Sequence, residues 1–474
     1  MPFEVNRFHA LVFVTWQLAN LAVGQYIFSI FATYVPSFKC GDGPVTRNCR
    51  IFETCNKSEL VFVDEMFASA AIEFEWVCSH HNAKFNSIQF VGVLVGTLFF
   101  GIASDYFGRK PIGVIAILIS ICSSFATGMS PNQHLLYVAR FCGGLSIAGV
   151  LVVVCAWILE SILPHQRMVV RGFFNWGWTR IFTTLICFFA GEWRMASYVF
   201  ALCLLPALFM TVFVLPESPI WLHSKGRITE MIETEKYMAE IAGVPFVPVE
   251  HHLIESKSFW AVIKTKGTFF KLFILWIFWF GVAVCGFSND LNSGKLVGNL
   301  YMNQILFGII IVISKVVLLF VDKNFDWFKR RTLHQGSIAG TVLCFGVLGA
   351  MCHNHYHGTG VLVVFLIGTL MIEYTWDAVY LITIESMETS SRTSTSGSCS
   401  FLARMGSLVA PILTHISTWW PLVFYITIMV IGSITFVISY FFLEETKDVD
   451  LDEVHIEKKE VSPDEIPMLD MKEA

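Results

Sequence analysis

The sequence predicts an all-α membrane protein whose twelve transmembrane helices form two six-helix bundles. Composition is the first observation behind this prediction. Hydrophobic residues make up 55% of the 474 residues and charged residues only 15%, whereas a soluble domain carries about 25% charged residues. Patterning is the second, because the apolar residues gather into twelve runs of roughly the 20 residues that a helix needs to cross a bilayer. A polar interval divides these runs into two sets of six.

Each apolar run is expected to be a helix, because a lone strand would leave backbone groups unpaired in lipid. The first run is longer than the apolar region of a signal peptide and has no obvious small-residue cleavage site, so we interpret it as a retained helix. The runs lie near residues 11–31, 86–104, 112–129, 135–159, 169–190, 196–215, 269–288, 298–321, 334–352, 360–383, 397–418 and 421–442.

Four segments follow from this pattern. Residues 1–215 and 269–443 are expected to form the two bundles. The interval 216–268 mixes charged with apolar residues and is expected either to form short amphipathic helices on the cytoplasmic face or to be a plain linker. The tail 444–474 is rich in Glu, Asp and Lys, and too poor in apolar residues to fold alone, so we expect it to be disordered.

The distribution of basic residues predicts the orientation. Cytoplasmic loops carry an excess of Lys and Arg, whereas the loops near 353–359 and 415–420 contain neither. We therefore expect a multi-pass plasma-membrane protein with both termini in the cytoplasm. The basic residues that mark alternate loops are Arg109, Lys110, Arg167, Arg171, Lys323, Lys329, Arg330 and Arg331.

A polar loop at 32–85 lies outside the cell in this topology. Four cysteines in an oxidising compartment suggest two disulfides, and the sequence leaves all three pairings open. Asn56 begins an Asn-Lys-Ser sequon on the usable side of the membrane, so we expect it to be glycosylated. The four cysteines are Cys40, Cys49, Cys55 and Cys78.

The turn from Gly101 to Lys110 reads Gly-Ile-Ala-Ser-Asp-Tyr-Phe-Gly-Arg-Lys and lies between two membrane-length runs. It resembles the Gly-x-x-x-Asp-x-x-Gly-Arg-Arg/Lys loop between the second and third helices of major facilitator transporters. The resemblance implies a major facilitator fold, in which two bundles alternate access to a site between them.

Further stretches resemble the organic cation, anion and carnitine transporters of solute carrier family 22, and the resemblance covers about residues 1–447. The long cysteine-bearing loop is one such stretch, and Glu-Trp-Val-Cys at its end is similar to the family's Glu-Trp-x-x-Val-Cys. Two positions depart from the family, since Ile220 replaces the usual Arg and Lys329 replaces a Gly. The other matches are Pro216 to Leu222, Lys225 to Arg227, Glu385 to Arg392, Ala403 to Gly406, Pro411 and Glu445 to Lys447.

Charged residues at the cytoplasmic helix ends form a candidate gating network. Such residues can pair in one conformation and separate in another, which biases a gate. Static pairing that only marks topology is the alternative. Two glycines allow close helix approach and a tight turn. The candidate gating residues are Gly101, Asp105, Gly108, Arg109, Glu160, Arg167, Glu217, Glu385 and Arg392.

Five ionisable residues are expected inside membrane helices, where each costs roughly 2.5–3.5 kcal/mol on insertion scales. Glu373 and Asp377 lie four residues apart and therefore share one helix face. Together with Arg180, Lys315 and Arg404 they leave one excess positive charge. The sequence therefore predicts that these five residues line a substrate site.

Two of these cations occupy positions that imply an anionic substrate. Lys315 corresponds to the lysine of the Phe-Gly-x-x-x-x-x-x-Lys stretch of organic anion transporters, and Arg404 corresponds to an arginine of anion and carnitine carriers. A guanidinium binds a carboxylate or sulfate through two hydrogen bonds, and an ammonium adds a compact charge. Alternatively, Glu373 and Asp377 neutralise these cations, or bind a proton or the cationic end of a zwitterion. Arg180 matches no family position, so a local ion pair is its default.

We therefore predict a secondary active or facilitative transporter of small organic ions, with anions favoured. The alternatives are a carrier of carnitine-like zwitterions or organic cations, a sugar carrier of the same superfamily, and a receptor or scaffold that does not transport. No phosphate-binding loop appears, nor an enzyme motif, and the His353-Asn-His355-Tyr-His357 spacing is not a standard metal site. The expected partners are a small organic ion and the lipid bilayer, with no cofactor, metal or nucleic acid. The pattern specifies neither a coupling ion nor an oligomeric state.

Overall fold

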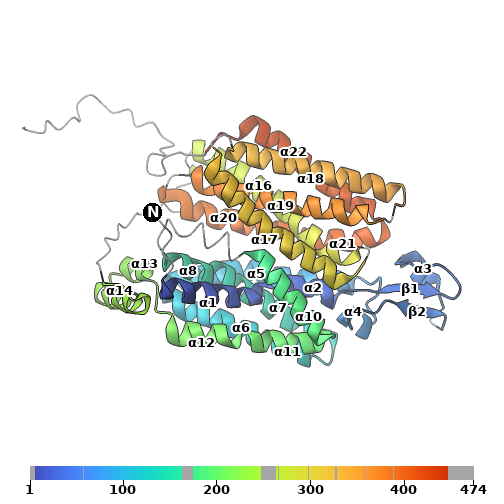
Figure 1. The fold of residues 1–474 in the computed structure, drawn as a ribbon, viewed down its shortest axis with the longest axis horizontal. Coiled ribbons are helices and arrows are strands. Elements are labelled where there is room, and N and C mark those ends of the chain that lie inside the picture. The colour runs from blue at the N-terminus through green and yellow to red at the C-terminus, as the bar shows by residue number, and fades with distance from the viewer. Residues whose placement is uncertain are drawn as a thin grey trace, which may run out of the picture.

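A computed structural model gives the structure of the chain. It describes residues 6–47, 49–56, 58–162, 175–246, 263–264, 266–296, 298–325, 328–356, 358–387 and 389–446, with the side chains of 266, 323 and 389–393 excepted. Helices make up most of this structure (Figure 1).

Within the described residues, eleven helices are long and apolar enough to cross a membrane. The remaining predicted run, 169–190, begins outside the described residues, and α10 occupies its described part. The helices of the first half are α1 (Arg7–Val23) continued by α2 (Gln25–Ala32), α5 (His81–Phe107), α6 (Arg109–Met129), α7 (Gln133–Gly149) continued by η1 (Val150–Val154) and α8 (Cys155–Glu160), α10 (Trp176–Ala190), and α11 (Trp193–Cys203) continued by α12 (Leu205–Phe209) and η3 (Met210–Val214). Those of the second half are α16 (Lys266–Asn292), α17 (Leu300–Asn324), α18 (Arg330–His353), α19 (Gly360–Glu385), α20 (Thr389–Ser407) continued by α21 (Val409–Trp419), and α22 (Leu422–Phe442).

Asparagine side chains begin several of these helices. The amide oxygen of Asn132 accepts a hydrogen bond from the backbone N–H of Leu135 at the start of α7, 3.0 Å away. Asn6, Asn175 and Asn299 cap α1, α10 and α17 in the same way. Such caps satisfy backbone donors that have no partner inside the helix. The sequence therefore marks these helix starts locally, between the apolar runs.

The two halves lie side by side in Figure 1, the first half in blue to green and the second in yellow to red. Each half has its own apolar core. Large aromatic side chains such as Phe28, Trp76 and Phe200 fill the first, and Phe278, Phe345 and their neighbours fill the second. Leu300 and Tyr301 of the second half join the core of the first half, so apolar as well as polar residues lie between the halves.

Two ends of the molecule can be distinguished. At one end lie the strands β1 (Ser37–Cys40) and β2 (Leu60–Val63) with the short helices α3 (Cys49–Thr54) and α4 (Ala70–Glu73), and we call it the disulfide end (Figure 1). At the opposite end lie α13 (Pro219–Ser224) and α14 (Ile228–Ala242), where α1 begins. We call this the terminal end. The described part of the interval 216–268 thus contains two short helices, and most of the tail 444–474 lies outside the described residues.

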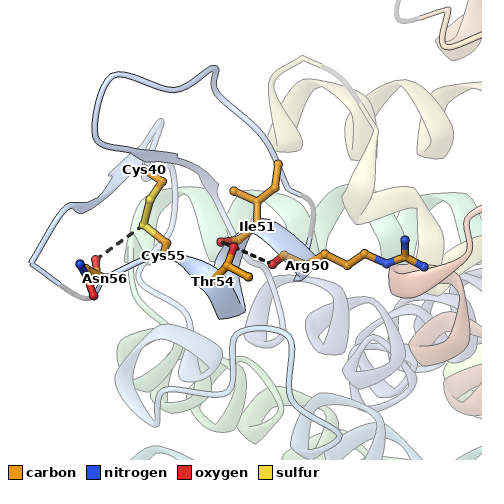
Figure 2. Close-up of a disulfide and its surroundings, with 6 residues drawn as sticks. All are labelled: Cys40, Arg50, Ile51, Thr54, Cys55 and Asn56. Carbon is orange, nitrogen blue, oxygen red and sulfur yellow. Dashed lines mark hydrogen bonds between the residues drawn. A yellow bond between two sulfur atoms is a disulfide. The ribbon is translucent and has the colours of Figure 1, made fainter.

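The loop 32–85 folds into a small compact unit. Its strands pair antiparallel, with Ser37 opposite Val63. Two disulfides close it, Cys40 with Cys55 and Cys49 with Cys78, which selects one of the three pairings that the sequence left open. Figure 2 shows the first disulfide with Asn56 directly beside it at the edge of the loop. Asn56 is exposed, as a glycan acceptor must be.

The two halves contact each other closely at the disulfide end. The hydroxyl of Tyr301 on α17 donates to the backbone carbonyl of Met66 in the loop, 2.8 Å away, and its ring stacks on Phe31. Arg47 donates to the carbonyl of Lys295. Both of these hydrogen bonds join the two halves at this end. The disulfide-bonded loop therefore bridges the two halves.

Candidate functional site

Lys315 lies in α17 and forms two ion pairs with residues of α19. Its ammonium is 2.7 Å from a carboxylate oxygen of Asp377 and 3.2 Å from one of Glu373. The two acids face α17 together because they are one helical turn apart. The side chains of the three residues are 11%, 21% and 16% exposed in the order Lys315, Asp377, Glu373. The predicted neutralisation of Lys315 by these acids is thus present in this conformation.

Arg180 on α10 crosses from the first half to the second. Its Nη1 donates to Asp290 on α16 at 2.9 Å, and its Nε donates to Gln304 on α17 at 3.0 Å. The guanidinium also lies over the ring of Phe307, 5.0 Å from its centroid. Arg180 is fully buried. The expected ion pair of Arg180 therefore exists, but it joins the two halves instead of staying within one.

Arg404 lies near the middle of the helix formed by α20 and α21. No carboxylate among the described residues forms an ion pair with it. Its guanidinium interacts with the hydroxyl of Tyr26 from the first half, while its Nε is buried without a hydrogen-bond partner in the described part of the chain. Arg404 thus differs from Lys315 and Arg180, which both have acidic partners.

Aromatic rings from both halves surround Tyr26. Its ring centroid is 5.2 Å from that of Phe90 and 5.2 Å from that of Phe287. Phe287 in turn contacts Trp376, and Trp176 lies edge-on to Tyr26. The arrangement places flat apolar surfaces around Tyr26, the residue with which the guanidinium of Arg404 interacts.

A further buried arginine, Arg140 on α7, lies within the first half and is 1% exposed. It donates to the side chains of Gln25 and Ser29 at 2.7 and 2.6 Å, and also to Gln89. It stacks over Phe85 as well. All these partners are neutral. Sequence reasoning missed Arg140, although it lies six residues inside the predicted run 135–159.

At the terminal end, the first half carries a cluster around Arg109. Its guanidinium is 2.7 Å from Asp105 and 3.2 Å from Glu160, and it donates to the hydroxyl of Ser104. These three partners come from α5 and α8. The predicted gating residues Asp105, Arg109 and Glu160 are thus brought together, all within one half.

Glu217 joins the stretch after the sixth helix to the turn at Gly108. Its carboxylate accepts hydrogen bonds from the backbone N–H groups of Arg109, Lys110 and Ser218 at 2.9–3.0 Å. Burial raises the pKa of Glu217, although these hydrogen bonds oppose the shift. Gly108 has a φ of 111°, and a Cβ there would collide with the carboxylate. Only glycine fits this turn, which explains the motif physically.

The second half repeats this cluster around Arg330. Its guanidinium is 2.5 Å from Asp322 and 2.9 Å from Glu385. Glu445 accepts from the backbone N–H of Arg330 at 2.9 Å, as Glu217 does in the first half. The candidate gating residue Glu385 is therefore part of a matching intra-half cluster.

Three further gating candidates are placed differently. Gly101 lies on α5, and a Cβ there would meet only Val152 at 4.0 Å, so close packing does not require glycine at this position. Arg167 and the side chain of Arg392 lie outside the described residues.

The family model for "Sugar (and other) transporter" matches residues 70–457. This chain belongs to that family. An uncharacterized Caenorhabditis elegans protein, F23F12.3, is 35% identical to it over 94% of each chain. Mouse solute carrier family 22 member 7 is 25% identical, covering 82% of this chain and 74% of its own length. The Drosophila melanogaster organic cation transporter-like protein is 24% identical, covering 92% and 80%. The predicted resemblance to solute carrier family 22 is confirmed.

The fold is shared with solved major facilitator structures. The inward open conformation of the xylose transporter XylE from E. coli superposes with a TM-score of 0.65 at 15% identity, over 94% of this chain and 98% of that one. The proton:xylose symporter XylE bound to 6-bromo-6-deoxy-D-glucose superposes with a TM-score of 0.61 at 17% identity. The predicted major facilitator fold is confirmed, and the chain is a multi-pass membrane protein of a transporter family.

Proposed function

We propose that this chain carries small organic anions across the plasma membrane by alternating access, and that Arg404 receives the anion. The observation that carries this proposal is that Arg404 has no carboxylate partner among the described residues and that its Nε is buried without a hydrogen bond there. A cation without a partner inside a membrane helix is costly. An anionic substrate supplies the missing charge through charge-assisted hydrogen bonds, and Lys315 and Arg180 already have carboxylates for this purpose.

The surroundings of Arg404 favour a substrate with a flat apolar body. Tyr26, Phe90 and Phe287 come from both halves and stack close to one another. Aromatic side chains bind flat apolar surfaces through offset or edge-on contacts. The proposed substrate is therefore an aromatic or similarly flat organic anion.

Carnitine-like zwitterions and organic cations form the second candidate class. Glu373 and Asp377 are partly exposed, so a cationic group that displaces Lys315 would find two carboxylates. A fly relative is named as organic cation transporter-like. This candidate ranks second because both acids already have a cationic partner here.

For topology and gating, we propose that the disulfide end is extracellular and the terminal end, with both termini, is cytoplasmic. The ion pairs of Arg109 and Arg330 then hold together the cytoplasmic helix ends within their own halves, so that each half moves as a rigid body. Asp105→Asn removes one ion pair of Arg109 and is expected to lower transport at unchanged surface expression. Normal turnover in this variant would reduce the cluster to static pairing.

A competition screen tests the proposed substrate class. Cells expressing the chain are given labelled benzenesulfonate, carnitine or tetraethylammonium, each against an excess of the other two. The proposal predicts saturable benzenesulfonate uptake that aromatic acids inhibit and tetraethylammonium does not. Saturable uptake of tetraethylammonium alone would assign the cation class. If none of the three is taken up, a parallel assay with labelled hexose that shows uptake would assign a sugar carrier.

A further inference from the structure

The two ion-pair groups described above belong to one charge network. Asn289, next to Asp290 on α16, donates to the hydroxyl of Thr369 on α19 at 3.0 Å. Thr369 lies one helical turn before Glu373, so this bond joins α16 to α19 close to the level of Glu373. Asp290 acts electrostatically on Glu373. The network therefore runs from Arg180 through Asp290 and Glu373 to Lys315.

This network contains three carboxylates and only two cations. Its members are Arg180, Lys315, Asp290, Glu373 and Asp377. Lys295, in the short helix η4 (Ser293–Lys295) that follows α16, does not balance it, because its ammonium is bonded to the carbonyl of Thr414 and the hydroxyl of Ser417. One negative charge is thus in excess at a depth where an uncompensated charge is expensive.

Within the described part of the chain, the other helices that pack against α19 supply no further charge to the network. Arg330 on α18 is bonded to Glu385 at the terminal end, and His334 on the same helix is bonded to Ser439 of α22. Arg404 on α20 acts on Tyr26. The charges that bear on Glu373 are those of Lys315, Asp290 and Asp377.

We infer that the network binds one proton, held by the carboxyl group of Glu373, and that this proton travels with the organic anion. Glu373 is the member best placed to hold it. Its contact with Lys315 is 3.2 Å, against 2.7 Å for Asp377, and it faces two other carboxylates. The carboxylate of Asp290 already has a cationic partner of its own in Arg180, 2.9 Å away.

Two observations favour a proton over a metal cation. Within the described residues, no group of three acidic, histidine or cysteine side chains converges as a metal site requires. In addition, the side-chain oxygen of Asn289 is buried without a hydrogen-bond partner in the described part of the chain. The amide nitrogen of Asn289 is bonded to Thr369, one turn before Glu373, so its free oxygen can accept from a donor that arrives on this stretch of α19.

The proton balance of the transport step follows from this assignment. One monovalent anion bound at Arg404 and one proton bound at Glu373 cross together, and no bond other than the carboxyl O–H forms or breaks. The cargo is then electrically neutral. Uptake is expected to respond to a pH gradient and not to membrane potential.

The test rests on the proposed function and uses purified full-length protein in liposomes. Labelled benzenesulfonate is the probe, because a sulfonate stays ionised and cannot carry a proton across the bilayer itself. The prediction is that an inward proton gradient drives its accumulation several-fold and that a trapped pH dye reports acidification of the lumen when benzenesulfonate is added. Clamping the membrane potential should change neither signal.

Glu373→Gln keeps the Lys315–Asp377 pair and removes the proposed proton site. We expect this variant to lose pH-driven accumulation of benzenesulfonate far more strongly than it loses exchange of labelled for unlabelled benzenesulfonate, which needs no net proton movement. Glu373→Asp, which keeps a carboxyl group, should recover part of the pH-driven uptake. Exchange also shows that the variant is folded.

The outcomes separate the two proposals. Absence of benzenesulfonate uptake under any gradient, together with uptake of tetraethylammonium, rejects the proposed anion transport. Benzenesulfonate uptake by the wild type without luminal acidification, or uptake that depends on Na⁺ instead of pH, rejects the proton site and leaves anion transport standing. Unchanged pH-driven accumulation in Glu373→Gln rejects Glu373 as the carrier of the proton.

Discussion

The guanidinium of Arg180 on α10 lies 2.9 Å from the carboxylate of Asp290 on α16, so a buried ion pair joins the two halves of the protein. Removing one partner of a buried pair leaves an uncompensated charge and costs about 3–5 kcal/mol. Because the Asp290 side chain is 21% exposed, we expect a loss near the lower end, about 3 kcal/mol, for Asp290→Leu. Thermal unfolding of the purified protein in detergent measures it.

The double variant Arg180→Met/Asp290→Leu tests whether the loss comes from the broken pair. It replaces both charges by apolar groups and should unfold at a higher temperature than Asp290→Leu alone. Asp42→Asn, at a fully exposed carboxylate, is the control. Additive losses in the double variant would show that the two side chains contribute independently.

Glu73 at the disulfide end predicts a pH dependence of stability. Burial alone would raise the pKa of Glu73, but hydrogen bonds from Arg194 and Trp193 outweigh it and hold the pKa below the ordinary 4.5. A carboxyl group whose pKa is lowered by folding contributes stability above its unfolded pKa, and that stability is lost as the pH falls through the folded value.

Glu73→Gln should therefore lower stability at neutral pH and have little effect at a pH well below 4.5. The Glu73 side chain is 43% exposed, so solvent screening limits the difference to less than about 1 kcal/mol. Unfolding midpoints of wild type and variant at the two pH values measure it. An equal loss at both would assign the effect to packing instead of charge.

The topology assignment predicts glycosylation at Asn56. The residue is exposed beside the Cys40–Cys55 disulfide, and both modifications belong to an extracellular compartment. Glycosidase treatment of the protein from animal cells should increase its gel mobility, and Asn56→Gln should remove the shift. If treatment changes nothing and the variant migrates like the wild type, the proposed orientation loses this support.

Much of the fold could be predicted from sequence because membrane helices are signalled locally. The apolar runs gave the helices, with ends close to Arg109, Gly360 and Phe442. Disulfide pairing could not be ranked, since it depends on how β1, β2 and α3 pack. The sequence identified the intramembrane charges, but not which of them meet.

The residues of the candidate site were also predicted only in part. Lys315, Glu373 and Asp377 were predicted and do come together. Asp290 was missed because it lies just beyond its apolar run 269–288, where an acid reads as a loop residue. Its role depends on Arg180, which comes from a helix of the other half. Only the three-dimensional arrangement shows that, of the three predicted cations Arg180, Lys315 and Arg404, Arg404 is the one without a carboxylate partner among the described residues.

Arg404→Ala tests the proposal that Arg404 binds the organic anion. A hydrogen bond to a charged group is worth about 1.5–3 kcal/mol, so the apparent affinity for benzenesulfonate should fall roughly ten-fold to a hundred-fold, with surface expression unchanged. Lys315→Ala also removes a cation, and its comparison separates a local effect of Arg404 from a general change of charge. The account predicts that Arg404→Ala loses anion uptake more strongly than Lys315→Ala. If both variants reach the surface and carry benzenesulfonate like the wild type, while tetraethylammonium competes and aromatic acids do not, the anion assignment is contradicted and Glu373 with Asp377 becomes the substrate site.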